Sequence, residues 1–113
     1  MVTKMNLKLY KDNLLEQEHK DINCMYQNNN VSFLLNDCKM ILNKHIFLRE
    51  NNDFKFNINL STKTCTILLK EQGKEFDIPI EQVSFSQQDK IMILAYKTAS
   101  DDKSTKIVIE LSD

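Results

Sequence analysis

The chain has almost no glycine or proline. Among its 113 residues there is one of each, Gly73 and Pro79, and there is no tryptophan. A single glycine excludes the phosphate-binding loops that need several, and it excludes the G-x-S-x-G elbow of serine hydrolases. The scarcity also means that other residues must occupy the turn positions that require a positive φ angle.

An excess of charge of one sign is also absent. Fifteen Lys and Arg stand against sixteen Asp and Glu, so the formal net charge is −1 and no basic field exists to hold a polyphosphate; we therefore expect no nucleic-acid partner. Residues 1–10 contain no apolar stretch of the kind that a signal peptide needs, and the longest apolar run is residues 91–96. We expect no membrane association and a cytoplasmic location.

The three cysteines, Cys24, Cys38 and Cys65, are widely spaced and form no C-x-x-C pair. An odd number of this kind is typical of free thiols that are buried in a reducing cytosol. On strands, Cys24 differs in parity from His19, as Cys38 does from His45, so each pair points to opposite faces. The sequence predicts no metal site and no cofactor.

Alternation of apolar and polar residues is the clearest positive pattern. Phe54, Phe56 and Ile58 alternate with polar residues, which places the apolar groups on one face of a strand. The same period returns in residues 76–80 and 107–111. Weaker segments lie at 5–9, 22–26, 31–35, 46–48, 64–69 and 91–96, and together they predict about nine strands.

Clusters of Asn and Asp separate these segments, at a spacing of roughly ten residues. Both side chains tolerate left-handed backbone angles, so we expect them to occupy the turns of an antiparallel meander. Between Ile80 and Val83 the apolar parity changes, which predicts a β-bulge at residues 81–82. Pro79 has no backbone N–H to donate to a neighbouring strand, so we expect a local gap in strand pairing there.

Two segments fit neither period well. In residues 13–25 the apolar side chains approach helical spacing behind Asn13, which could cap a helix, so a short helix there stays an alternative to a strand. In residues 38–50 we favour two strands around Asn43 and Lys44.

A sheet with one apolar face and almost no helix to cover that face must cover itself. Consecutive hairpins favour closure into a barrel. We therefore predict a single all-β domain over residues 1–113, an antiparallel up-and-down barrel of eight or nine strands, with the short helix as an alternative. Such a barrel encloses an interior that side chains fill or that holds one small ligand.

A family resemblance agrees with this prediction. The pattern from Phe47 through Arg49-Glu50-Asn51-Asn52 and the Phe54–Ile58 alternation to residues 63–71, together with the closing pattern of residues 90–96 and 106–111, resembles the YwiB-like proteins of low-GC Gram-positive bacteria. The resemblance implies a calycin-type, lipocalin-like β-barrel, a cytoplasmic location and no established activity.

Aromatic residues on the predicted strands are the candidate ligand-binding residues. If they face a common interior they form either core or a ligand cup, and they are Phe33, Phe54, Phe56, Phe76 and Phe85. Arg49 is the only arginine, and a guanidinium at the barrel mouth could bind a carboxylate or phosphate. We favour the plainer interpretation, in which Arg49 braces a turn by pairing with Glu50 or Asp53.

The strand at residues 91–96 is apolar on both faces, so one face needs cover from outside the barrel. A helix over residues 13–25, a loop or a second copy of the chain could provide this cover, and an interface with a second copy or a protein partner would include Met92, Leu94 and Tyr96. The leading functional hypothesis is a non-catalytic barrel that binds a small apolar or amphipathic molecule, and the alternative is an interaction or structural module.

Overall fold

Eleven strands and no helix make up the part of the chain that the computed structural model describes, residues 2–112. The strands are β1 (Val2–Lys11), β2 (Leu14–Gln27), β3 (Asn30–Leu35), β4 (Cys38–Leu42), β5 (Ile46–Glu50), β6 (Phe54–Asn59), β7 (Thr64–Leu69), β8 (Lys74–Ile78), β9 (Ile80–Gln88), β10 (Ile91–Thr98) and β11 (Thr105–Leu111). The all-β prediction is confirmed. The expected count of eight or nine strands is wrong, because the count included only one of the two strands favoured in residues 38–50 and because Pro79 divides one predicted strand into β8 and β9.

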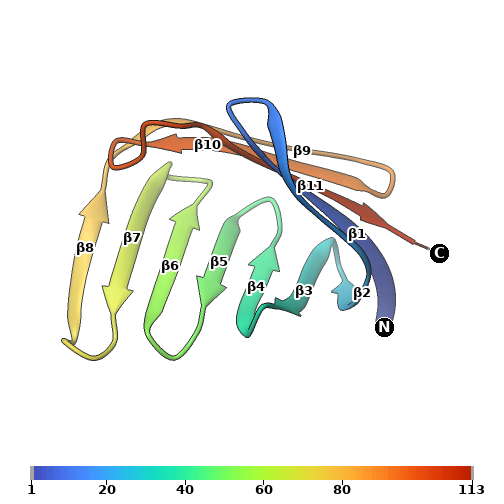
Figure 1. Cartoon of the computed structure of the whole chain (residues 1–113), viewed down its shortest axis with the longest axis horizontal. Coiled ribbons are helices and arrows are strands. Elements are labelled where there is room, and N and C mark those ends of the chain that lie inside the picture. The colour runs from blue at the N-terminus through green and yellow to red at the C-terminus, as the bar shows by residue number, and fades with distance from the viewer. Residues whose placement is uncertain (1, 113) are drawn as a thin grey trace.

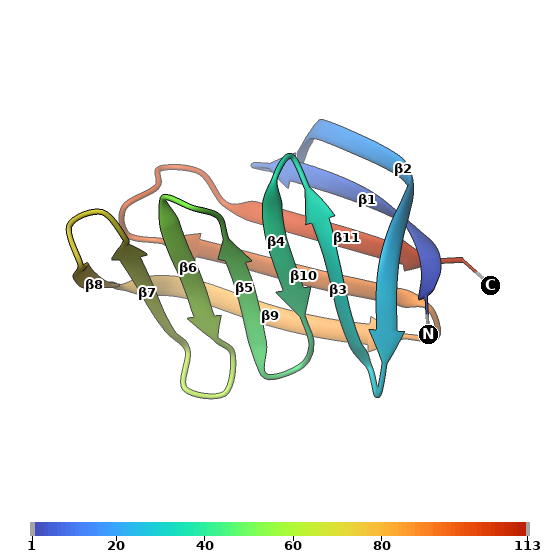
Figure 2. The same cartoon turned by 90° about the horizontal axis from the view of Figure 1, so that it is seen from below.

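The strands form one antiparallel sheet that curls into a nearly closed barrel (Figure 1). Every strand pairs with its neighbours in sequence except at two places: β1 pairs with β11, and β8 does not pair with β9. Figure 2 shows the result as two layers whose strands cross at a steep angle, with β3 to β8 in one layer and β9, β10, β11 and β1 in the other. The last four residues of β2 pair with β3, and residues 14–25 pair with β1, so β2 joins the layers.

The alternative of a helix over residues 13–25 is wrong, since β2 is extended throughout this segment. Its register on β1 shifts twice, and at the first shift Asp21 has a positive φ of 56° and donates its backbone N–H to Asn6 Oδ1 at 3.0 Å. Each extra residue in a β-bulge resets the alternation of inward and outward side chains. Leu14, Leu15 and Met25 are exposed, so the apolar side chains of β2 do not form the single buried face that helical spacing suggested.

The two sheet edges meet where the chain turns a corner. Glu81 is the extra residue of a bulge, because Thr98 pairs with Ile80 and Lys97 with Gln82, which confirms the predicted position. Pro79 lies outside both strands, as expected, and its carbonyl accepts a hydrogen bond of 2.8 Å from the backbone N–H of Ala99. This contact fastens the corner to the end of β10.

Asparagine and aspartate take the turn positions, which confirms that part of the sequence interpretation. Apart from Lys63 and Gly73, the residues with positive φ are Asp12, Asn13, Asp21, Asn28, Asn29, Asn36, Asp37 and Asp89. Asn43, Asn51 and Asn59 act differently, because each side-chain oxygen accepts two backbone N–H groups at the start of the following turn. The two strands predicted around Asn43 are β4 and β5.

The inner face of the layer β3 to β8 consists of rows of side chains that follow the strand register. The first row is apolar throughout and contains Val31, Leu42, Phe47, Ile58, Cys65 and Ile78. Opposite it pack Met5, Met92, Leu94 and Ile109 of the other layer, and these four are fully buried. We call this sealed part of the interior the closed half. All three cysteines are free and buried, as the sequence predicted.

Candidate functional site

The second row of the same inner face interrupts the apolar pattern with one cation. In register order it contains Phe33, Met40, Arg49, Phe56, Ile67 and Phe76. Arg49 therefore points toward the interior from the middle of an apolar row. Side chains two residues apart on a strand point to the same face. Because Phe47 of β5 is buried in the core, Arg49 points to the same inner face.

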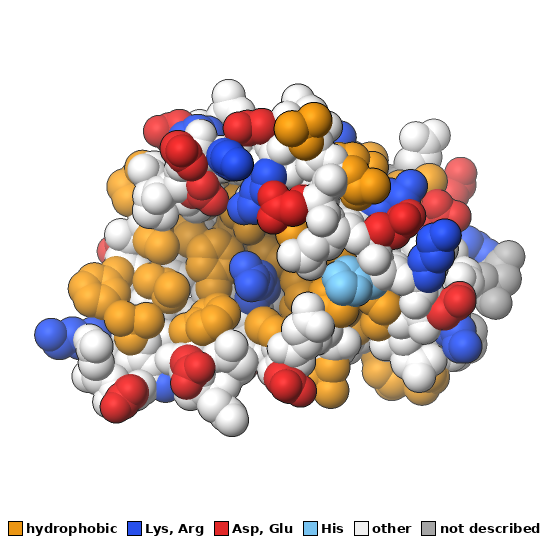
Figure 3. Space-filling view, viewed as in Figure 1, with side chains coloured by type: hydrophobic (Ala, Val, Ile, Leu, Met, Phe, Trp, Pro, Cys, Tyr) orange, Lys and Arg blue, Asp and Glu red, His pale blue; other side chains and the backbone are white. Residues whose placement is uncertain are grey.

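A cavity of about 380 Å³ opens at this end of the barrel. We call it the open half. Its lining comes from both layers and includes Leu7, Leu9, Lys11, Glu16, Gln17, Leu35, Asn36, Cys38, Met40, Arg49, Asn51, Phe54, Tyr96, Thr105 and Ile107. Figure 3 shows a hollow between the layers, with hydrophobic side chains on its walls and a basic side chain among them. Eight of these fifteen residues are apolar and seven are polar or charged, so the lining combines both characters.

Arg49 is half-buried and has an aromatic neighbour in place of an acidic one. Its guanidinium carbon lies 5.9 Å from the centre of the Phe54 ring. Among residues 2–112 no carboxylate oxygen lies within 4.0 Å of the Arg49 guanidinium, and Glu50 pairs with Lys70 Nζ at 2.9 Å. The expectation that Arg49 braces a turn through Glu50 or Asp53 is therefore wrong, because strand alternation turns Arg49 inward and Glu50 outward.

Tyr96 separates the closed half from the open half. Its ring centre lies 6.1 Å from that of Phe47 and 6.2 Å from that of Phe56, so three aromatic rings form one cluster. Burial raises the pKa of the Tyr96 phenol, and the positive charge of Arg49 opposes this effect. The hydroxyl therefore stays protonated at neutral pH.

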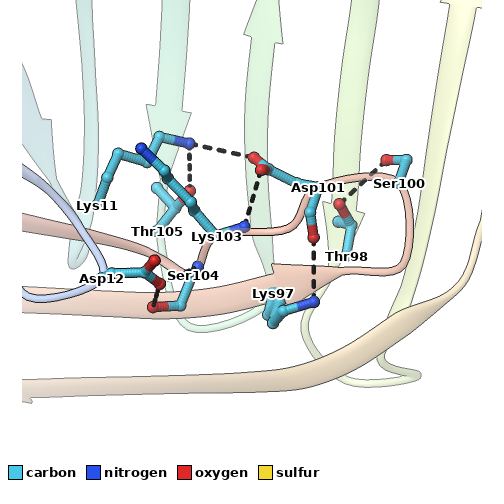
Figure 4. A network of polar contacts seen from close by, with 9 residues as sticks. All are labelled: Lys11, Asp12, Lys97, Thr98, Ser100, Asp101, Lys103, Ser104 and Thr105. Carbon is cyan, nitrogen blue, oxygen red and sulfur yellow. Dashed lines mark hydrogen bonds and ion pairs between the residues drawn. The ribbon is translucent and has the colours of Figure 1, made fainter.

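Lys11 and Thr105 form the polar rim of the cavity together with the β10–β11 loop (Figure 4). Lys11 Nζ donates to Thr105 Oγ1 at 2.6 Å and lies 3.3 Å from Asp101 Oδ2. The pKa of Asp101 is lowered, mainly by the backbone N–H of Lys103 and further by Lys11. Since Lys11 is balanced by Asp101, Arg49 is the cation of the cavity that has no acidic partner in the described part of the chain.

The same loop is fastened to the β1–β2 turn at a second point. Asp12 Oδ1 accepts hydrogen bonds from the Ser104 backbone N–H at 2.9 Å and from its hydroxyl at 3.2 Å. Lys97 Nζ donates to the Asp101 carbonyl at 3.0 Å, as Figure 4 shows. The contacts of Asp12 join segments far apart in sequence, whereas that of Lys97 is local, and together they hold the rim in place.

The structure brings only two of the predicted ligand-binding residues, Arg49 and Phe54, to the cavity lining. Phe33 and Phe56 belong to the same inner face, but Phe33 is core and Phe56 packs against Phe47 and Tyr96. Phe85 packs against the core from β9. Phe76 is 47% exposed on the edge strand β8.

Met92 and Leu94 are fully buried and Tyr96 is 9% exposed, so the prediction of an interface through these three residues is wrong. Both faces of β10 are apolar, as the sequence indicated, but these three side chains are the inward ones. The outward side chains are Ile91, Ile93 and Ala95, and Ile91 is 41% exposed. The sequence pattern left open which of the two apolar faces would be inside.

The sequence analysis did not identify the rim residues Lys11 and Thr105, although the sequence contains a signal for them. Lys11 has the parity of Leu7 and Leu9 on β1, and Thr105 has the parity of Ile107 on β11. A polar residue at the end of an inward-facing apolar series marks the point where a barrel interior meets water.

Outside the cavity of the open half, the other kinds of site to consider are catalytic pairs and metal-binding clusters. His45 Nδ1 lies 3.3 Å from Ser61 Oγ, but both side chains are on exposed turns away from the cavity lining. Within residues 2–112 no three His, Cys, Asp or Glu side chains are placed to share a metal ion. The described residues also contain no helix long and apolar enough to span a membrane.

Comparison with models of known families, with curated proteins and with solved structures gives no match in any of the three.

Proposed function

We propose that the chain is a non-catalytic protein that binds one small amphipathic molecule in the open half of its barrel. The observation that carries this proposal is the cavity of about 380 Å³ that lies between the two layers beside the buried core. Pockets that hold drug-sized ligands start at about 300 Å³. The lining suits a molecule with an apolar part and a polar part, because Leu7, Leu9 and Ile107 form walls below a rim of charged and amide groups.

A cytoplasmic location and the YwiB-like resemblance remain part of the proposal. Three free and buried thiols support a reducing compartment, since none of them is committed to a disulfide. The nearly closed all-β barrel supports the kind of fold that the resemblance implies.

A second candidate function is association through an exposed apolar sheet face. Val2, Met25 and Leu34 are 67%, 48% and 69% exposed, and they lie on the adjacent strands β1, β2 and β3 around a shallow depression. Contiguous apolar surface of this kind is typical of sites that meet another protein or a second copy.

Native mass spectrometry of the protein purified from its own cells tests the proposal and separates the two candidates. We expect one subunit that carries one small molecule, and we expect this molecule to be lost on denaturation. Leu35→Trp fills the cavity mouth, whereas Leu34→Trp makes the same change on the outward face of β3. The ligand should disappear from the Leu35→Trp variant and remain on the Leu34→Trp variant.

Equal retention of the small molecule by both tryptophan variants would place it outside the cavity and contradict the proposal. Subunit pairs without any bound molecule would favour the second candidate instead. In that case Leu34→Trp, and not Leu35→Trp, should change the proportion of pairs.

A further inference from the structure

We propose that the ligand of the open half carries a single negative charge, a carboxylate at the end of an apolar chain, and that Arg49 binds this carboxylate. The inference rests on the proposed function, because it specifies the chemistry of the molecule that the cavity holds. It follows from the position of Arg49, the charges around it and the apolar walls below it.

Arg49 occupies a position that strand register assigns to an apolar side chain. Its partners across β4 and β6 are Met40 and Phe56, and its charged group contacts the ring of Phe54. A partly buried charge without an opposite charge is unfavourable for folding. A hydrophobic side chain at this position would stabilise the fold more than an arginine does. Fold stability therefore does not explain the arginine, whereas binding of an anion does.

The other charges of the cavity restrict the anion to one negative charge. Lys11 is balanced by Asp101 at 3.3 Å, so it adds little net attraction. Glu16 also belongs to the lining and opposes a second negative charge on the ligand. What remains is one guanidinium that has no carboxylate within 4.0 Å among residues 2–112, and its planar pair of N–H groups matches the two oxygens of a carboxylate.

The walls next to Arg49 define the rest of the molecule. Met40 is its neighbour in the row, and Leu7, Leu9 and Ile107 of the opposite layer line the same cavity. These side chains offer an apolar chain a place away from water while its charged end stays at Arg49. An alkyl carboxylate combines the two features in one molecule.

Isothermal titration calorimetry with decanoate and with decanol tests the inference, because the two probes share an alkyl chain and differ in charge. The wild-type protein should bind decanoate at least about tenfold more tightly than decanol. Arg49→Met should weaken decanoate binding by about tenfold or more and leave decanol binding unchanged. Lys55→Met is the matched control, since Lys55 is a cation of the same β5–β6 hairpin that faces outward, and it should change neither affinity.

Arg49→Lys provides a second variant that keeps the charge and loses the planar pair of donors. We expect it to bind decanoate with an affinity between those of the wild type and Arg49→Met. Equal affinity of the wild-type protein for the two probes, or decanoate binding that Arg49→Met leaves intact, would overturn the inference while the proposed function stands. If neither probe binds and the protein from its own cells carries no small molecule, the proposed function fails as well.

Discussion

The two halves of the barrel interior use the same strands in different ways. In the closed half, Phe47 and Ile58 meet Leu94 of the opposite layer in a continuous apolar core. Two residues further along β5 the inward position holds Arg49, and the layers separate around a cavity. The comparison teaches that the same strands can form a sealed apolar core in one half of the interior and leave a cavity in the other.

The largest expected effect comes from truncating one phenylalanine in each half. Phe47→Ala should lower the free energy of unfolding by about 3–5 kcal/mol, because it removes a fully buried ring and leaves a cavity. Phe54→Ala should lower it by no more than about 2 kcal/mol, because the Phe54 ring is only half-buried at the mouth. Urea denaturation of both variants measures the difference. Equal losses of the free energy of unfolding in the two variants would contradict the distinction between a closed and an open half.

The next largest expected effect is a pH dependence of the free energy of unfolding, which comes from the buried thiol of Cys65. Burial raises the pKa of Cys65 from 9.0 to about 11. Below pH 9 the thiol is protonated in both the folded and the unfolded chain. The neutral buried thiol therefore makes its full contribution to the free energy of unfolding in this range. Between pH 9 and 11 the unfolded chain ionises first, and the free energy of unfolding should fall by about 2 kcal/mol.

Urea denaturation at a series of pH values from 8 to 11 measures this loss. Cys65→Ala should be less stable at pH 8 but should lose less on going to pH 11, because the ionising group is gone. An identical pH dependence in the two proteins would mean that water reaches the closed half at Cys65.

The smallest expected effect has the opposite sign and lies in the open half. Arg49→Met should raise the free energy of unfolding by about 1 kcal/mol, since it replaces an uncompensated, half-buried cation in an apolar row with an apolar side chain. Thermal and urea denaturation without added ligand measure the change. A loss of stability in this variant would indicate that Arg49 is structural, and it would weaken the case for a binding role.

Local patterns predicted much of the fold, because they depend on neighbouring residues. The inward and outward faces of β6 follow from alternation, and the turns at Asn36-Asp37 follow from side chains that accept positive φ. The bulge at Glu81 was visible as a change of parity. By contrast, the two bulges of β2 gave no clear signal in the sequence, because each parity change falls in or beside a polar segment.

The sequence by itself determined that the chain would be all β, that asparagine would make its turns and that its sheet would have to cover its own apolar face. Only the tertiary structure decided which inward side chains are sealed and which face a cavity, and that Arg49 of one layer lies across from Lys11 and Thr105 of the other. The physical reason is that alternation fixes the face of each side chain within its own strand. What stands opposite that face depends on the pairing of β1 with β11 and on the steep crossing of the two layers, which are properties of the folded sheet as a whole.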